Sequence, residues 1–211
     1  MDEQSLSWPY WLTRAILANG QEAWMDAVWS VGGSPPYGGV SYEEGAAVYA
    51  LLEAYQGPGM APSSAYDVVA AHLGGAPDSV LALEIFRLHD AIASRDVARA
   101  TREEIDAGKA LAQDLRDPRA ALYFELLDGD LAVREERITD ARDRFLACAN
   151  ELNGMAVEDP VYVTRLVDVM VNVATLSVRE GDFDVARTMA TALQLLGQAD
   201  RLGELREVLL G

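Results

Sequence analysis

The chain has 211 residues, half of them apolar, and a formal net charge of −17. The apolar content is too high for a disordered chain, and the length suffices for one mid-sized domain or two small ones. The negative charge argues against nucleic acid and against anionic membrane surfaces as partners, because both would be repelled. We therefore expect a folded, acidic protein whose charged partners are basic.

Two further features bear on where the protein works. The longest uncharged stretch, residues 27–42, contains Gly-Gly and Pro-Pro pairs that argue against a membrane helix, and the first residues lack a secretion signal. The single cysteine, Cys148, excludes an intramolecular disulfide and a thiolate metal cluster. We expect a cytoplasmic protein. Its one lysine against sixteen arginines indicates GC-rich bacterial coding, with adaptation to high salt as the alternative.

The first 76 residues differ in composition from the rest, since they hold all four tryptophans and only one basic residue, Arg14. Helical periodicity and capping signals in this region predict four helices, at residues 8–18, 21–31, 41–55 and 63–73. Asn19-Gly20 predicts the end of the first helix. The glycine- and proline-rich stretches 32–39 and 56–62 predict loops.

From residue 77 onward the helix signals are clearer. Asp117-Pro118 and Asp159-Pro160 each place a capping aspartate before a proline at the first helical position. Residues 161–178 are rich in valine, yet their apolar residues recur at helical spacing, so we predict a buried helix there.

A near-constant spacing links these helices. Pro77, Pro118 and Pro160 are 41 and 42 residues apart, and three alanines follow them by 23, 23 and 26 residues: Ala100, Ala141 and Ala186. Three such units predict stacked helical hairpins, because one hairpin alone cannot bury its apolar stripe.

These motifs resemble the tetratricopeptide repeat, a unit of two antiparallel helices. The turn and later packing positions match at Gly181, Phe183, Ala186, Ala190 and Leu193, and the preceding unit matches at Ile138, Ala141, Phe145 and Cys148. Tyr42, Gly45, Tyr49 and Leu52 repeat the spacing near the N-terminus. Two departures stand out: Glu136 replaces the turn glycine, and the period is 41 to 45 residues where the family has about 34.

The resemblance implies an all-α fold of stacked antiparallel hairpins, a tetratricopeptide-like α-solenoid with roughly 9–11 helices. Other helical-hairpin repeats remain open. We expect a tryptophan-rich region at residues 1–76 and the repeats at residues 77–211, together forming one continuous domain.

No residue pattern predicts catalysis, a cofactor or a metal site. His72 and His89 lack metal-ligand spacing, Cys148 occupies a core position, and the stretch 32–39 lacks the lysine and the amides of a phosphate loop. We interpret the acidic clusters as solvated faces, with aspartates at the start of a helix offsetting its dipole. These clusters are Glu43-Glu44, Asp128 with Asp130, and Glu135-Glu136.

The resulting hypothesis is a protein-interaction scaffold or adaptor that binds a basic or amphipathic protein or peptide. The resemblance implies groove-facing positions at Asp168, Thr175 and Arg179. The tryptophans have two interpretations: an N-terminal core, or an exposed partner or dimer contact that includes Trp11 and Trp24. Two alternatives stay open: a small-ligand-binding or enzymatic protein with a site between the N-terminal region and the repeats, and a homodimerising regulatory module.

Overall fold

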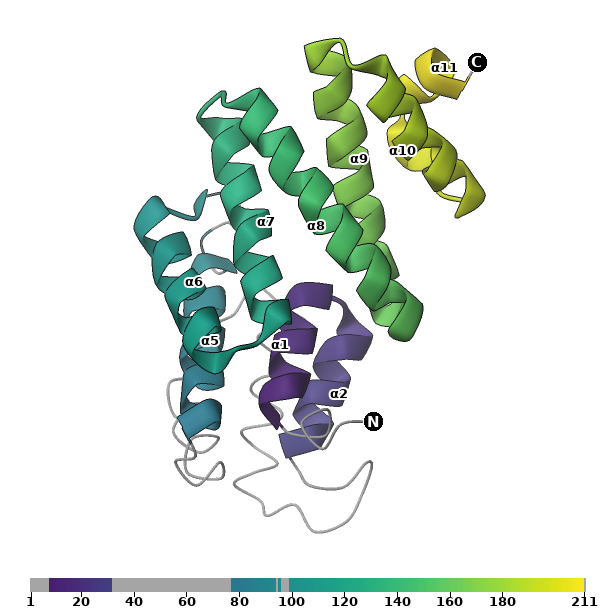
Figure 1. Ribbon diagram of the computed structural model, residues 1–211. Coiled ribbons are helices and arrows are strands. Elements are labelled where there is room, and N and C mark those ends of the chain that lie inside the picture. The colour runs from purple at the N-terminus through teal and green to yellow at the C-terminus, as the bar shows by residue number, and fades with distance from the viewer. Residues whose placement is uncertain (1–7, 32–76, 94, 96–98, 211) are drawn as a thin grey trace. The chain divides into compact units, whose positions relative to one another are not determined.

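The computed structural model describes residues 8–31, 77–93, 95 and 99–210 (Figure 1). This part of the chain contains nine α-helices, two short 3₁₀ helices and no β-strand, which confirms the all-α prediction. Several predicted features lie outside the described residues: the helices at 41–55 and 63–73, the loops at 32–39 and 56–62, and His72.

Packing divides the chain into two compact units, Met1–Phe124 and Glu125–Gly211. The boundary falls inside helix α7 (Pro118–Arg134), whose first residues belong to unit 1 and whose remainder belongs to unit 2. The predicted division into residues 1–76 and 77–211 stays a prediction, because most of the first region lies outside the described residues.

Unit 1 contains the beginning of α7 and four other described helices: α1 (Trp8–Ala18), α2 (Gln21–Val31), α5 (Pro77–Ala93) and α6 (Arg102–Leu115). The first two have the bounds that periodicity predicted, and Asn19 ends α1 in the left-handed conformation at φ 50°. Helix α1 packs on α2 and α5, and α5 packs on α6.

Aromatic residues from α2, α5 and α7 form part of the core of unit 1. Trp24 stacks on the imidazole of His89, with ring centroids 5.6 Å apart, and meets Phe86 edge-on at 5.8 Å. The hydroxyl of Tyr123 lies 2.8 Å from Nδ1 of His89. His89 is only 2% exposed, so it lies in the core.

Asp117 organises the start of α7. One carboxylate oxygen accepts hydrogen bonds from the backbone amides of Arg119 and Ala120, at 2.8 and 3.3 Å. The other oxygen accepts from the hydroxyl of Thr13 on α1, at 2.9 Å, and from the guanidinium of Arg119, at 2.6 Å. Asp117 therefore caps α7, as predicted, and also connects it to α1.

Unit 2 contains the rest of α7 and four further helices: α8 (Ile138–Glu158), α9 (Val163–Glu180), α10 (Phe183–Leu195) and α11 (Leu205–Leu210). Helix α9 packs on α8 and on α10, and successive helices from α8 to α10 run in opposite directions (Figure 1). The predicted buried helix is α9, preceded by a 3₁₀ turn at Pro160–Tyr162. Asp159 caps that turn by accepting from the amide of Val161 at 3.2 Å. A second 3₁₀ helix spans Ala199–Leu202.

Four of these helices end in the same way. After α6, α7, α9 and α10 comes one residue in the left-handed conformation: Arg116 (φ 56°), Glu136 (φ 58°), Gly181 (φ 81°) and Gly197 (φ 69°). In each case the backbone amide of the next residue donates a hydrogen bond to the carbonyl five residues earlier; for example, the amide of Arg137 lies 2.9 Å from the carbonyl oxygen of Ala132. This is the Schellman closure, and it recurs even where the chain lacks glycine. The sequence alignment of Glu136 with Gly181 thus agrees with the backbone.

Two helical glycines allow close packing between neighbouring helices. A Cβ on Gly108 of α6 would lie 2.1 Å from the ring of Phe124 in unit 1. A Cβ on Gly129 of α7 would lie 2.8 Å from the ring of Phe145 in unit 2. Each phenylalanine ring therefore packs directly on the backbone of the glycine, and a side chain at the glycine position would block this contact.

The three alanines used for the sequence spacing are not equivalent. Ala141 and Ala186 are each the fourth residue of a helix and are fully buried. Ala100 precedes α6, whose fourth residue is Ile105. The interpretation of Ala100 as the matching alanine is wrong, because the capping box of Thr101 starts the helix only after it.

Candidate functional site

Helix α9 has a polar face that the other described helices leave exposed or partly exposed. We call this set the α9 face: Thr164, Asp168, Asn172, Thr175 and Arg179. Its members recur every three or four residues, so they share one side of the helix, and each is exposed or half-exposed. The opposite side is core: Leu166, Val167, Val169, Met170, Val173, Ala174, Leu176 and Ser177. The face therefore offers polar side chains along the whole length of a helix whose other side is anchored.

The structure places all three predicted groove residues on the α9 face. The carboxylate of Asp168 pairs with the guanidinium of Arg201 from the second 3₁₀ helix. The hydroxyl of Thr175 donates to the carbonyl of Val171 in its own helix at 2.8 Å. Arg179 is exposed in the last turn of α9, where a cation complements the helix dipole.

The two tryptophans predicted as partner contacts have different environments. Trp24 is 6% exposed and packs among Phe86 and His89, so its side chain belongs to the core of unit 1. Trp11 is half-buried; the guanidinium of Arg14 lies 5.2 Å from its ring centroid and Tyr10 meets it edge-on. Only Trp11 presents part of its side chain at the surface, and its role in binding stays a prediction.

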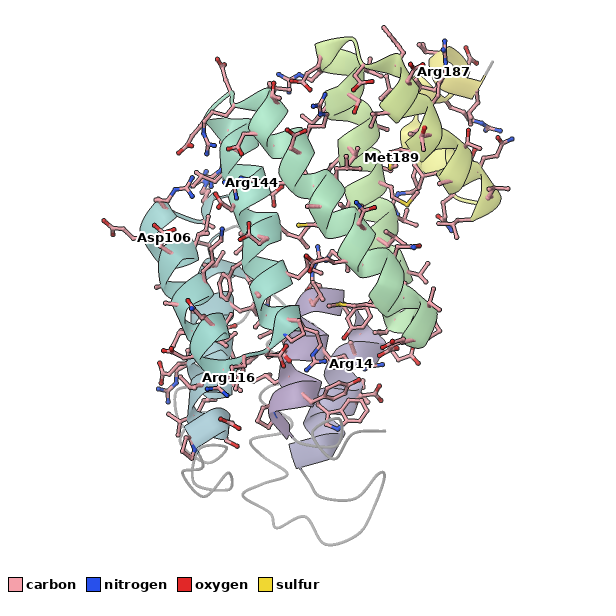
Figure 2. All side chains as sticks on the ribbon, in the orientation of Figure 1. Arg14, Asp106, Arg116, Arg144, Arg187 and Met189 are labelled. Carbon is pink, nitrogen blue, oxygen red and sulfur yellow. The ribbon has the colours of Figure 1, made fainter. Side chains whose placement is uncertain are left out.

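The acidic pair of α7 differs from the sequence interpretation. Asp128 is 2% exposed, and its carboxylate lies 2.8 Å from the guanidinium of Arg144 on α8. Arg144, labelled in Figure 2, also pairs with Glu125 at 3.1 Å and with Asp140 at 3.0 Å. The prediction of a solvated face is wrong for Asp128, because the close approach of α8 at Gly129 covers this side of α7.

Asp130, one residue beyond Gly129, is half-buried in unit 2. Burial raises the pKa of its carboxyl above the ordinary value, and the positive charges of Arg165 and Arg134 only partly offset that effect. Asp130 is thus a carboxyl in a partly dry environment, with arginines from α7 and α9 nearby.

A repeat spacing in the sequence could have identified residues of α7 that correspond to the α9 face. The 45-residue offset that relates Ala141 to Ala186 also relates Asp130 to Thr175 and Arg134 to Arg179. The alignment by proline spacing obscured it, because the first helices of the two hairpins differ in length: 17 residues in Pro118–Arg134 against 21 in Pro160–Glu180.

The described residues contain no group of three or more His, Cys, Asp or Glu side chains arranged to hold a metal ion. Cys148 is buried, in the core position that the sequence predicted.

The segment Pro160–Glu180 is long and apolar enough to cross a membrane by length and composition. Half of its most apolar stretch is buried inside the structure, and the core helices of soluble proteins can be equally long and apolar. This segment is therefore weak evidence of a membrane protein.

Comparisons of the chain with models of protein families, with curated proteins and with solved structures find no match. The functional argument therefore depends on the residues and the packing of this chain.

Proposed function

We propose that the protein is an interaction scaffold or adaptor, and that a partner protein or peptide binds on the α9 face. The observation that carries the proposal is the continuous polar line from Thr164 to Arg179 on a helix anchored by its other side. A face of this kind binds without rearranging the core, which lowers the entropic cost of association. The equivalent positions on α7, Asp130 and Arg134, extend the same surface within unit 2.

The proposed architecture is a tetratricopeptide-like stack of helical hairpins. Three features of the described helices support it: the repeated Schellman ends, the buried alanine at the fourth position of both α8 and α10, and the packing of Phe145 on Gly129. Hairpin stacks of this type present extended surfaces to peptides and helices.

The proposed partner is basic or amphipathic, and the proposed location is the cytoplasm. The net charge of −17 supports a basic partner, because it would speed the encounter with cations and repel polyanions. The single cysteine, buried in α8, fits a reducing compartment, where disulfides do not stabilise proteins.

Site-specific photocrosslinking tests the proposal. A photoreactive amino acid replaces Thr175 on the α9 face of the full chain, and a matched variant carries it at Thr188, which is exposed on α10. After irradiation in a lysate of the native host, mass spectrometry identifies crosslinked proteins. We expect a reproducible adduct from position 175 that is absent from position 188. The captured protein is then purified and titrated against the chain.

A charge-reversal pair completes the test. Arg179→Glu removes the guanidinium at the C-terminal end of the α9 face and should weaken the binding of the purified partner by about fivefold or more, because the hydrogen bonds of that guanidinium to the partner are lost. Arg187→Glu, the same change at an exposed position of α10, should leave binding unchanged. Equal adducts at both photoreactive positions, or equal affinity of the two arginine variants, would remove the α9 face as the binding site.

A further inference from the structure

The first turns of α8 meet the turn between α9 and α10 through an ionic cluster in unit 2. The guanidinium of Arg142 lies 2.6 Å from the carboxylate of Glu180 and 3.3 Å from that of Asp182. The hydroxyl of Thr139, one turn earlier on α8, donates to the other oxygen of Glu180. The side chains of Arg142 and Glu180 are 19% and 17% exposed, whereas those of Asp182 and Asp143 are 36% and 60% exposed, so ions in the solvent reach the cluster from the side of the two aspartates.

Two of the acids that Arg142 contacts, Glu180 and Asp182, flank the glycine of this turn. Glu180 is the last residue of α9, Gly181 follows in the left-handed conformation, and Asp182 is the N-cap of α10. One oxygen of Asp182 accepts from the amide of Val185 at 3.3 Å, while the other faces Arg142. A single cation therefore contacts both ends of a three-residue connection.

The cluster holds more negative than positive charge. Arg142 also donates to its neighbour Asp143 at 2.8 Å, and this hydrogen bond is the main reason that the pKa of Arg142 lies above its ordinary value. Three carboxylates thus share one guanidinium. Without that guanidinium, Glu180 and Asp182 would repel each other across Gly181, whose backbone is the most easily rearranged of any residue.

We propose that this cluster, the Arg142 latch, is a salt-sensitive device that holds the α9–α10 turn against the start of α8. Salt screens the attraction between Arg142 and its carboxylates, and screening releases the turn into local opening. Arg179 directly precedes Glu180, so opening also loosens the end of the α9 face; that consequence rests on the proposed function, whereas the latch itself does not.

The chain contains a matched control for Arg142. Arg142 follows the buried Ala141 on α8, and Arg187 follows the buried Ala186 at the same position of α10. Arg187 (Figure 2) is exposed, and the described residues show no ion pair for it. Removing charge at Arg187 therefore changes the total charge as removal at Arg142 does, without touching the latch.

Hydrogen exchange of the full chain, resolved at single amides, tests the latch. The reporters are the amides of Gly181, Asp182 and Ala186, which bond to carbonyls within and beside the turn. In the wild type we expect them to exchange about fivefold faster in about 0.5 M than in about 0.02 M sodium chloride. In Arg142→Gln they should exchange fast at both salt concentrations, whereas Arg187→Gln should follow the wild type.

Core amides of α8, such as that of Leu152, separate local opening from global unfolding, because their exchange should not change with salt over this range. If Arg142→Gln unfolds globally, Arg142→Lys replaces it: the charge is kept but the two-pronged geometry is lost, so salt dependence should persist with faster exchange. Salt-independent exchange of the turn in the wild type, or unchanged salt dependence in Arg142→Gln, would overturn the proposal. No partner is needed, so failure here and failure of the binding proposal are distinguishable.

Discussion

Single side chains decide how closely the helices approach. Glycine in a helix ordinarily costs about 1 kcal/mol relative to alanine, because its unfolded backbone has more freedom. At Gly108 and Gly129 we expect packing to outweigh this cost, because a phenylalanine ring occupies the space where an alanine methyl group would lie. Gly154, in α8, has nothing within 4 Å of an added Cβ and shows what the same substitution does in open space.

We therefore predict that glycine-to-alanine substitution destabilises the protein at two of these positions and stabilises it at the third. Gly108→Ala and Gly129→Ala should each lower the free energy of unfolding by about 1–3 kcal/mol, because the new methyl group overlaps Phe124 or Phe145. Gly154→Ala should raise it by about 0.5–1 kcal/mol. Urea unfolding followed by circular dichroism measures all three. Stabilisation by Gly108→Ala would contradict the close packing of α6 on Phe124.

Asp130 gives a prediction about pH. Its folded-state pKa is raised above the ordinary 3.8, chiefly by burial, so the folded chain binds this proton more tightly than the unfolded chain. The contribution of Asp130 to stability is therefore most favourable below 3.8 and is lost as the pH rises through the raised pKa. Asp130→Asn, which stays neutral, should unfold at a higher urea concentration than the wild type at about pH 7, and this advantage should shrink toward about pH 4.

The control for this measurement is Asp114→Asn, at an exposed position of α6. It removes the same charge from the chain without changing a buried carboxyl. If Asp130→Asn destabilises the protein at neutral pH while Asp114→Asn does not, the attraction of Arg165 and Arg134 outweighs the cost of burial and our sign is wrong.

At the scale of whole elements, several helices have the same C-terminal conformation. Five described helices close with a residue in the left-handed conformation, which costs about 1 kcal/mol for a residue with a Cβ and little for glycine. Asn19, Arg116 and Glu136 carry a Cβ in this conformation, whereas Gly181 and Gly197 do not. Closure is therefore imposed by the packing of the following helix and not by the terminal residue alone.

Because of this C-terminal conformation, we predict that Glu136→Gly stabilises the protein by about 0.5–1 kcal/mol, since glycine adopts a φ of 58° without strain. Glu135→Gly, one position earlier, should not stabilise it, since Glu135 has no such conformation to relieve. Thermal and urea unfolding of the two variants measures the difference. An unchanged or lowered stability of Glu136→Gly would mean that its side chain makes a contact that outweighs the strain.

For the whole molecule, the dominant quantity is charge. A net charge of −17 keeps copies of the chain apart by repulsion near neutral pH, and the isoelectric point of about 4.4 marks where that repulsion vanishes. The membrane-length segment Pro160–Glu180 does not alter this expectation, because half of its apolar window is already buried.

We predict a sharp minimum of solubility close to pH 4.4, with recovery on either side. Turbidity and the concentration left after centrifugation, measured without detergent, check this. A chain that needs detergent at neutral pH would instead favour membrane association through α9. Loss of solubility near neutral pH without such a requirement would indicate self-association through an apolar surface.

Local rules determined most of the helical architecture from the sequence alone. The helices of residues 8–18 and 21–31, the capping by Asp117 and Asp159, and the turn at Gly181 were predictable because each depends on neighbours within a few residues. Asp168, Thr175 and Arg179 were named from the resemblance to the tetratricopeptide repeat, and the structure places all three on one side of α9.

Only the tertiary structure decided which charges are buried and which repeats correspond. Asp128 looked solvated until α8 covered it, Ala100 looked equivalent to Ala141 until Thr101 started the helix, and the contacts of Arg142 join residues about 40 positions apart. The physical reason is the same in each case. Burial and ion pairing depend on elements that are distant in sequence, whereas helix starts, stops and faces depend on a few adjacent residues.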